Sequence, residues 1–264
     1  MADNRATRRE VRLTERDLRV LSFMAEHRLV LETHIQKLLG TSADATRTRL
    51  RALARAGYVT HRRVFDAEPA VCQIRRSGLA AISSRLQPPQ LKLGCYAHDV
   101  GAGWLCLAAR EGTFGLMREV IAERELRSHD GRVDRDAEPY GVRLGGVGPH
   151  GRERLHYPDL LLITPEGRRI AVELELSSKG TRRREHILGG YGADGRIDAV
   201  LYLVENPSLA RAIEQSAERV GVDDRVHVQY FRWAGRAPGA QRGRAPERRR
   251  SRSLVASSPI EGSR

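Results

Sequence analysis

Three acidic side chains and a lysine in the second half of the chain have types and spacing suited to metal chemistry. Asp159 precedes one apolar run, and Glu173 and Glu175 lie inside the next. Lys179 follows four residues later. An ionised carboxylate in an apolar strand must be paired, hydrogen-bonded or bound to a metal. Carboxylate oxygens beside a lysine suit a hard cation such as Mg²⁺ and metal-assisted phosphodiester cleavage.

Two predicted strands would bring these side chains together. Residues 160–163 and 170–176 are apolar, and the Thr-Pro-Glu-Gly sequence between them is typical of a hairpin turn. Side chains alternate along a strand, so Glu173 and Glu175 project to the same side, where Asp159 of the partner strand can join them. We therefore predict a catalytic group of Asp159, Glu173, Glu175 and Lys179, with the three acids as Mg²⁺ ligands.

The pattern resembles that of the PD-(D/E)XK nuclease-like superfamily, which has Pro-Asp on one strand and an acid, any residue and lysine on the next. Pro158 and Asp159 supply the first part and Glu173 the second acid, while Glu175 stands where the family has its lysine. Lys179 could reach back to that place. The resemblance implies an α/β core of the restriction-endonuclease type, with Lys179 stabilising charge on phosphate. Whether cleavage is retained stays open.

The residues also allow a reading without catalysis. In it, the acidic strands are partly buried and are balanced by Arg182, Arg183 and Arg184, which could equally serve as phosphate clamps. The two functional hypotheses are a metal-dependent DNA endonuclease and a transcription or copy-number regulator with an inactive nuclease-like domain.

Length and charge point to two domains and a tail. A chain of 264 residues suits two domains, and paired prolines at 88–89 indicate a linker. Residues 1–90 hold 17 basic and 9 acidic side chains, and residues 91–234 hold 21 and 22. An excess of positive charge in the first region favours binding to phosphate. We predict domains at 10–86 and 92–233, and a disordered basic tail at 235–264 that adds non-specific affinity for nucleic acid.

The first domain carries the signals of a winged helix-turn-helix. Thr14 and Asp17 form a capping pair, Gly40 ends a second helix and Ser42 caps a third. Strands are expected at 58–65 and 71–75, and a closing helix from Ser77. In this fold the third helix enters the major groove of duplex DNA and the wing contacts the backbone or minor groove.

The predicted DNA contacts lie on that helix and on the wing. Helical spacing places one set of side chains opposite the apolar face of the third helix. A solvated helix face and a protein-interaction module are the alternatives, and the net charge argues against the second. The predicted DNA-binding residues are Arg47, Thr48, Arg51, Arg55, Arg62 and Arg63.

The second domain is expected to begin with a helix at 98–110, in which His98 and Asp99 form a cap and first-turn acid. Glu123 would lie in a strand at 118–124, and residues 127–154 would form a mobile loop or loose hairpin. After the acidic hairpin, the periodicity predicts helices at 182–191 and 208–220 and strands at 199–204 and 225–231.

Several features bear on location. No run of about eighteen apolar residues is present, so no membrane association is expected, and the first residues lack an apolar signal segment. Cys72, Cys95 and Cys106 are spaced for neither zinc nor disulfides. They are expected to be buried thiols of a cytoplasmic protein.

The chain is similar to the replication-relaxation family of actinobacterial plasmids and mobile elements. The features that carry the similarity are the winged helix, residues 156–160, the strand 171–175, Lys179 and Tyr191. The similarity covers about residues 10–233. It implies a role on double-stranded DNA in mobile-element replication or conjugative mobilisation, with relaxase or replication proteins as partners. Modules of this kind often bind as pairs, so a homodimer is also expected.

Overall fold

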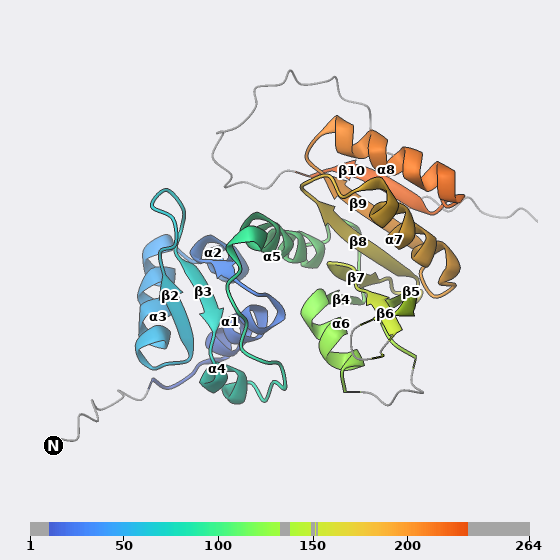
Figure 1. Ribbon diagram of the computed structural model, residues 1–264. Coiled ribbons are helices and arrows are strands. Elements are labelled where there is room, and N and C mark those ends of the chain that lie inside the picture. Colours follow the sequence, from blue (N-terminus) through green and yellow to red (C-terminus); the bar gives the residue numbers. More distant parts are fainter. Residues whose placement is uncertain (1–10, 133–137, 149–150, 152, 232–264) are drawn as a thin grey trace, which may run out of the picture.

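The computed structural model describes residues 11–132, 138–148, 151 and 153–231. These residues form a mixed α/β structure with eight α-helices, a small antiparallel sheet near the N-terminus and a larger mixed sheet. Figure 1 shows the two sheets on opposite sides of the molecule, with helix α5 (Tyr96–Arg110) between them. The predicted tail at 235–264 lies outside the described residues.

The N-terminal part contains four helices and a three-stranded sheet in the order β1-β3-β2. All neighbours in this sheet are antiparallel. The expected helices and both hairpin strands are confirmed; the two-residue strand β1 was not predicted, because two residues carry no periodicity. The elements are α1 (Glu15–Glu26), β1 (Val30–Leu31), α2 (Glu32–Leu39), α3 (Ala43–Arg55), β2 (Val59–Arg62), β3 (Val71–Ile74) and α4 (Arg76–Ala81).

Local capping sets the start of the first and third helices. The Asp17 carboxylate accepts a hydrogen bond from the Thr14 backbone N–H at 2.7 Å, and the Thr14 hydroxyl accepts one from Asp17. Ser42 caps α3 in the same way through the N–H of Ala45. Arg49 of α3 pairs with the buried Asp17, so the cap of α1 also holds α3 in place.

The second part is built on a five-stranded sheet in the order β10-β9-β8-β7-β4. The pairs β10-β9 and β9-β8 are parallel, whereas β8-β7 and β7-β4 are antiparallel. After α5 the elements are β4 (Glu119–Ala122), α6 (Glu123–Asp130), β5 (Val142–Val147), β6 (Glu153–His156), β7 (Leu160–Ile163), β8 (Arg169–Glu175), α7 (Thr181–Ala193), β9 (Ala199–Val204), α8 (Pro207–Val220) and β10 (Val226–Tyr230).

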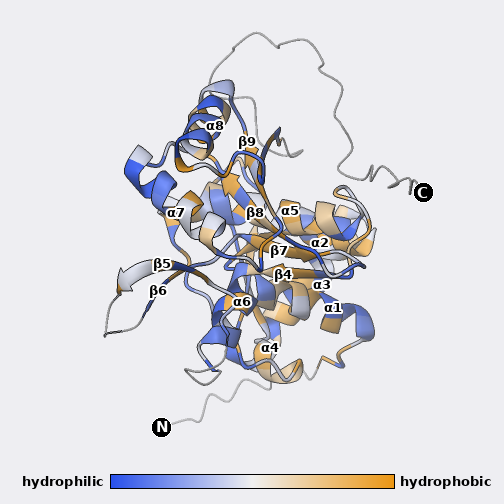
Figure 2. Cartoon of the chain, turned by 90° about the vertical axis from the view of Figure 1, so that its right-hand side faces the viewer, coloured by the Kyte–Doolittle hydropathy of each residue, from blue (hydrophilic) through white to orange (hydrophobic). Residues whose placement is uncertain are grey.

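Apolar side chains pack on both faces of this sheet, because successive residues of each strand point to opposite faces. Leu160, Val172 and Leu174 pack into the same core as Leu105 of α5 and the N-terminal helices. Leu161 and the apolar residues of α7 and α8 form the second core on the other face. In Figure 2 the strands are largely hydrophobic and the outer surfaces of α7 and α8 are hydrophilic. The sheet is therefore buried on both sides, as a mixed α/β sheet requires.

Of two predictions about the segment before the acidic hairpin, one is wrong and the other is confirmed in part. Glu123 does not lie in a strand, because β4 ends at Ala122 and α6 begins at Glu123. The acidic first turn and strong helix formers of residues 123–127 favour that start. Within residues 127–154, α6 continues to Asp130, and β5 and β6 then form a two-stranded antiparallel sheet. The hairpin alternative is confirmed for the described residues, and the loop alternative is not.

Two findings concern location and the cysteines. Among the described residues, no helix combines the length and the apolar character needed to cross a bilayer. Cys72 and Cys106 are buried free thiols, as expected, but Cys95 is exposed. It lies in the short 3-10 helix Leu93–Cys95 that precedes α5.

Candidate functional site

The acidic hairpin forms as predicted. Leu160 of β7 pairs with Val172 of β8, and the Asp159 backbone N–H donates to the Val172 carbonyl at 3.0 Å. Asp159 therefore lies directly before β7, next to the point where Glu173 follows Val172 on β8. The parallel neighbour β9 places Tyr202 beside Glu173 and closes the other side of the strand.

Glu173 is buried and fully engaged by its own chain. It is 3 % exposed, and its Oε1 lies 2.6 Å from His156 Nε2 and accepts a hydrogen bond of 2.6 Å from the Tyr191 hydroxyl. Burial alone would raise the pKa of this carboxyl, but His156, Lys179 and Tyr191 together hold that pKa below its ordinary value. Glu173 is thus an ionised group inside the protein with three partners.

Lys179 joins Glu173 and Glu175, as the sequence predicted. Its ammonium lies 2.7 Å from Glu175 Oε2 and 4.0 Å from Glu173 Oε2. Apart from this ion pair, Glu175 Oε2 has no hydrogen-bond partner. Burial raises the pKa of Glu175 despite the opposing effect of Lys179, and the two glutamates raise the pKa of Lys179 despite its burial. The contacts confirm that both glutamates project to one side of β8.

Asp159 contacts His98, which was expected to cap a helix. Its Oδ2 accepts a hydrogen bond from the Leu174 backbone N–H at 2.8 Å and lies 3.1 Å from His98 Nε2. Although burial opposes it, the hydrogen bond and charge of Asp159 raise the pKa of His98 to about 9. His98 is therefore a cationic partner of the site, and the prediction that it serves as a helix cap is wrong.

The carboxylates are compensated by residues other than the predicted arginines. Arg184 is buried, donates to the Ser216 hydroxyl at 2.9 Å and to the Lys179 carbonyl at 3.3 Å, and contacts none of the three acids. Arg182 and Arg183 are exposed at the start of α7. Nothing in the sequence indicated that His98, His156 and Tyr191 contact these acids. Periodicity places a residue on a helix or strand but not opposite a partner 17 to 61 residues away.

As they stand, the three carboxylates do not fit a divalent cation. A cation needs at least two or three oxygens converging on one point. Among the described residues, only Glu26, His27 and Cys106 bring three ligand atoms within 4.8 Å of one another. Mg²⁺ at the acidic hairpin would have to displace Lys179 from Glu175, so the Mg²⁺ site and the catalytic role of these residues stay predictions.

The predicted DNA-contact residues occupy one edge of the N-terminal part. Thr48, Arg51 and Arg55 of α3 are exposed, while Arg47 is partly buried and pairs with Asp44 at 3.1 Å. Helix α3 packs on α2 and β2, and Figure 1 shows it at the outer edge of the molecule. Three of the four predicted side chains of α3 are thus open to solvent.

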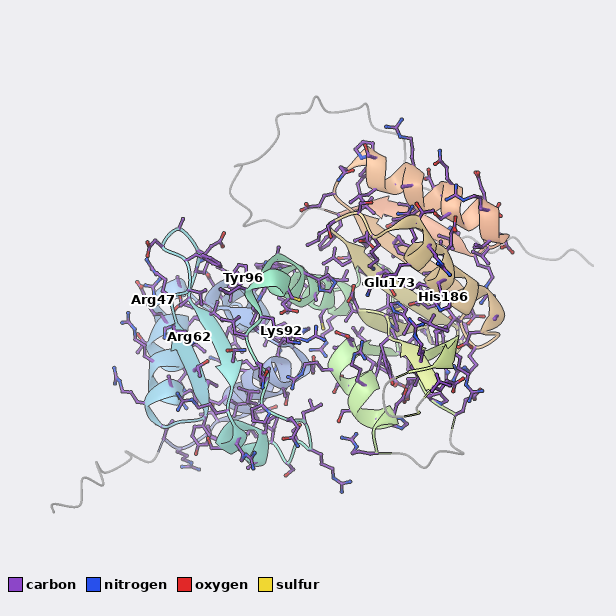
Figure 3. The ribbon with its side chains drawn as sticks, viewed as in Figure 1. Arg47, Arg62, Lys92, Tyr96, Glu173 and His186 are labelled. Carbon is purple, nitrogen blue, oxygen red and sulfur yellow. The ribbon has the colours of Figure 1, made fainter. Side chains whose placement is uncertain are left out.

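The two remaining candidates lie at the end of β2 and in the turn that follows it. Arg62 and Arg63 are exposed, and Arg63 donates to the Asp66 carbonyl at 3.3 Å. The Phe65 ring at this turn contacts Tyr96 of α5 edge-on, with a centroid distance of 4.9 Å. Figure 3 shows Arg47 and Arg62 on the N-terminal part and Glu173 on the strands of the other part. The basic edge and the acidic hairpin are therefore separate sites.

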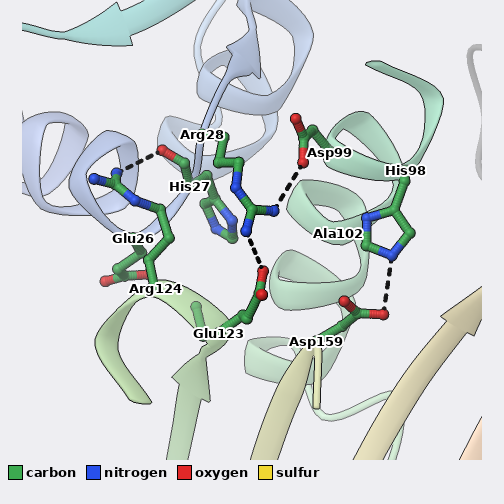
Figure 4. Close-up of a pocket in the computed structure, with 10 residues that line it drawn as sticks. Glu26, His27, Arg28, His98, Asp99, Ala102, Glu123, Arg124 and Asp159 are labelled. Carbon is green, nitrogen blue, oxygen red and sulfur yellow. Dashed lines mark hydrogen bonds and ion pairs between the residues drawn. The ribbon is translucent and has the colours of Figure 1, made fainter. Parts of the chain in front are cut away.

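Polar contacts join the two parts of the molecule. Arg28, in the loop after α1, pairs with Asp99 at 3.4 Å and with Glu123 at 2.8 Å. Arg124 donates to the backbone carbonyl of Ala25 at 2.6 Å. It also donates to the backbone carbonyl of His27 at 3.0 Å (Figure 4). These contacts line a cavity of about 20 Å³ that Asp159 also borders. Glu123 thus has a structural role at the junction and does not add an acid to the hairpin.

The raised pKa of His98 predicts a pH dependence of stability. A histidine whose folded-state pKa lies above its ordinary value of 6.5 stabilises the fold fully below that value, and the contribution is lost as the pH rises through about 9. We expect the free energy of unfolding, measured by urea denaturation, to fall over this interval. In the His98→Gln variant the fall should be smaller; an identical fall in the variant would contradict the assignment.

Comparison of the sequence with known protein families and with curated proteins found no match. The resemblance to the replication-relaxation family therefore stays a prediction. The class that the fold itself defines is a mixed α/β protein with a small antiparallel sheet near the N-terminus and a five-stranded mixed sheet.

Proposed function

We propose that this chain is a DNA-binding protein of mobile-element or plasmid replication or mobilisation, of the replication-relaxation kind. The N-terminal part would act as a winged helix-turn-helix, with α3 in the major groove and the β2–β3 turn as the wing. The observation that carries the proposal is the exposed basic face of α3, where Arg51 and Arg55 form no ion pair with any described residue. Unpaired arginines on such a face are free to neutralise phosphates.

The larger sheet would be a PD-(D/E)XK nuclease-like domain. The contact of Lys179 with both Glu173 and Glu175 supports this assignment, since the superfamily motif also combines acids with a lysine. The order of α5, the sheet strands β4, β7 and β8, then α7, β9, α8 and β10 supports it as well, with α6 and the β5–β6 hairpin inserted after β4. The exposed Arg182 and Arg183 lie beside the site and would face a bound phosphate backbone.

In this proposal the second domain clasps DNA and does not cut it. Each of the three carboxylates already has a basic partner, namely His98, His156 or Lys179. A transcription or copy-number regulator with an inactive nuclease-like domain would have this arrangement.

One observation favours the second candidate, a metal-dependent nicking enzyme. Glu175 Oε2 is buried and has no hydrogen-bond partner, so movement of Lys179 would leave a carboxylate oxygen in need of a cation. If a cation bound there, it would supply charge stabilisation for phosphodiester cleavage.

A cleavage assay separates the two candidates. The intact chain, Asp159→Ala and Glu173→Ala are incubated with supercoiled DNA and Mg²⁺ or Mn²⁺, with Glu166→Ala in the exposed turn as a control. We expect no metal-dependent nicking by any of them, alongside duplex binding by the intact chain. Nicking by the intact chain and Glu166→Ala that is lost in both site variants would establish the nuclease instead.

A further inference from the structure

A second cluster of ligating side chains lies away from the acidic hairpin, where α1 meets α5. Glu26 is the last residue of α1, His27 is its C-cap, and Cys106 lies in the middle of α5. One carboxylate oxygen, one ring nitrogen and the sulfur of these residues all lie within 4.8 Å of one another. We propose that Glu26, His27 and Cys106 hold a Zn²⁺ ion that ties the N-terminal part of the chain to the α/β part.

An unpartnered buried nitrogen is the second observation that indicates a ligand. The His27 side chain is 5 % exposed, and its Nε2 has no hydrogen-bond partner. A buried polar atom without a partner costs about 1–3 kcal/mol, so such atoms need an explanation. The His27 ring packs edge-on against the Phe23 ring, with a centroid distance of 4.6 Å. This apolar contact gives the imidazole nitrogens no hydrogen-bond partner. A metal bond would satisfy the imidazole.

The donor set selects the metal. A thiolate, an imidazole and a carboxylate are the ligands of Zn²⁺, whereas Mg²⁺ and Ca²⁺ take oxygen ligands. Zinc bonds of about 2.0–2.3 Å bring tetrahedral ligand atoms to roughly 3.3–3.8 Å from one another. Small rotations of the three side chains would bring their ligand atoms, now within 4.8 Å of one another, to that spacing.

The charges also balance. Glu26 and a deprotonated Cys106 carry two negative charges, and a neutral His27 adds none, so the three ligands offset the charge of Zn²⁺. Arg110, which pairs with Glu26, adds one positive charge, and Glu125 opposes it with one negative charge. Burial, together with His34 and two neighbouring arginines, lowers the pKa of His27 to about 3, which keeps the imidazole in the neutral form that binds metal. Burial raises the pKa of the Cys106 thiol to about 12, so the thiol is unreactive until a cation displaces its proton.

Neighbouring residues complete the site. Arg110 donates to Glu26 Oε2 at 2.7 Å, and Oε1 is not part of that bond. A positioned carboxylate of this kind is typical of metal ligands held by a further hydrogen bond. Glu125 of α6 is close enough to Glu26 and Cys106 to raise the pKa of both. A water molecule would take the fourth position.

Zinc analysis of the full-length chain tests the proposal. After exhaustive dialysis in metal-free buffer, the intact protein should retain one zinc ion per chain. His27→Gln and Cys106→Ser should retain almost none. Cys72→Ser is the matched control, because Cys72 and Cys106 are both buried and 0 % exposed. This variant should keep its zinc.

Cobalt substitution keeps the test valid if a variant folds poorly. Co²⁺ added to the chelator-treated intact chain should give a thiolate-to-cobalt charge-transfer band, which Cys72→Ser retains and Cys106→Ser lacks. Zinc far below one ion per chain together with no cobalt band would overturn the proposal, as would equal zinc in Cys106→Ser. The readout involves no DNA, so it is independent of the proposed function.

Discussion

Replacing Arg51 and Arg55 together by alanine is expected to weaken binding to duplex DNA by about 10- to 100-fold at physiological salt. Both side chains are exposed on α3, the helix that would enter the groove. Each phosphate contact contributes about 0.9 to the slope of log K against log salt concentration, so the slope should fall by about two. Fluorescence anisotropy with a labelled duplex over a series of salt concentrations measures both quantities.

A matched pair of arginines controls for the change in net charge. Arg168 and Arg211 are exposed on the α/β part, and their double alanine variant loses the same charge. It should bind almost as tightly as the intact chain and keep the slope. If both double variants lost affinity equally, binding would depend on net charge alone, and the assignment of α3 would be wrong.

Replacing Lys179 by methionine is expected to destabilise the fold by about 2–4 kcal/mol, because it leaves buried carboxylates without their cation. Glu175 is 4 % exposed, and its Oε2 has no other partner. The free energy of unfolding from urea denaturation at neutral pH measures the loss. Lys92→Met, at an exposed position before α5, should have little effect.

A second substitution identifies the cause. Adding Glu175→Gln to Lys179→Met removes the uncompensated charge, and much of the lost stability should return. A double variant as unstable as the sum of the two single variants would show that Lys179 acts through packing of its aliphatic chain.

The acidic hairpin could be predicted from sequence because its signals are local. Strand alternation places Glu173 and Glu175 on one side, and the turn at residues 164–167 fixes the register that sets Asp159 beside them. The capping of α1 and α3 is equally local, and both starts are confirmed. Local signals fail at α6, where a short amphipathic segment after β4 could be read as the end of the strand.

The partners of these residues could not be predicted, because they depend on tertiary packing. His98 reaches Asp159 only because α5 packs on the sheet, and Tyr191 reaches Glu173 only because α7 covers its other face. The same holds for Cys106, which sequence spacing excluded as a zinc ligand. About eighty residues separate it from Glu26 and His27, and only the tertiary fold brings their ligand atoms within 4.8 Å of one another.

Hydrogen exchange of the full-length chain with and without duplex DNA shows whether α3 binds the duplex. We expect DNA to slow amide exchange in α3 (Ala43–Arg55) and in the turn between β2 and β3, with smaller changes at the start of α7. Saturating DNA that leaves α3 and this turn unprotected, or protects only the α/β part, would contradict the proposed role of α3.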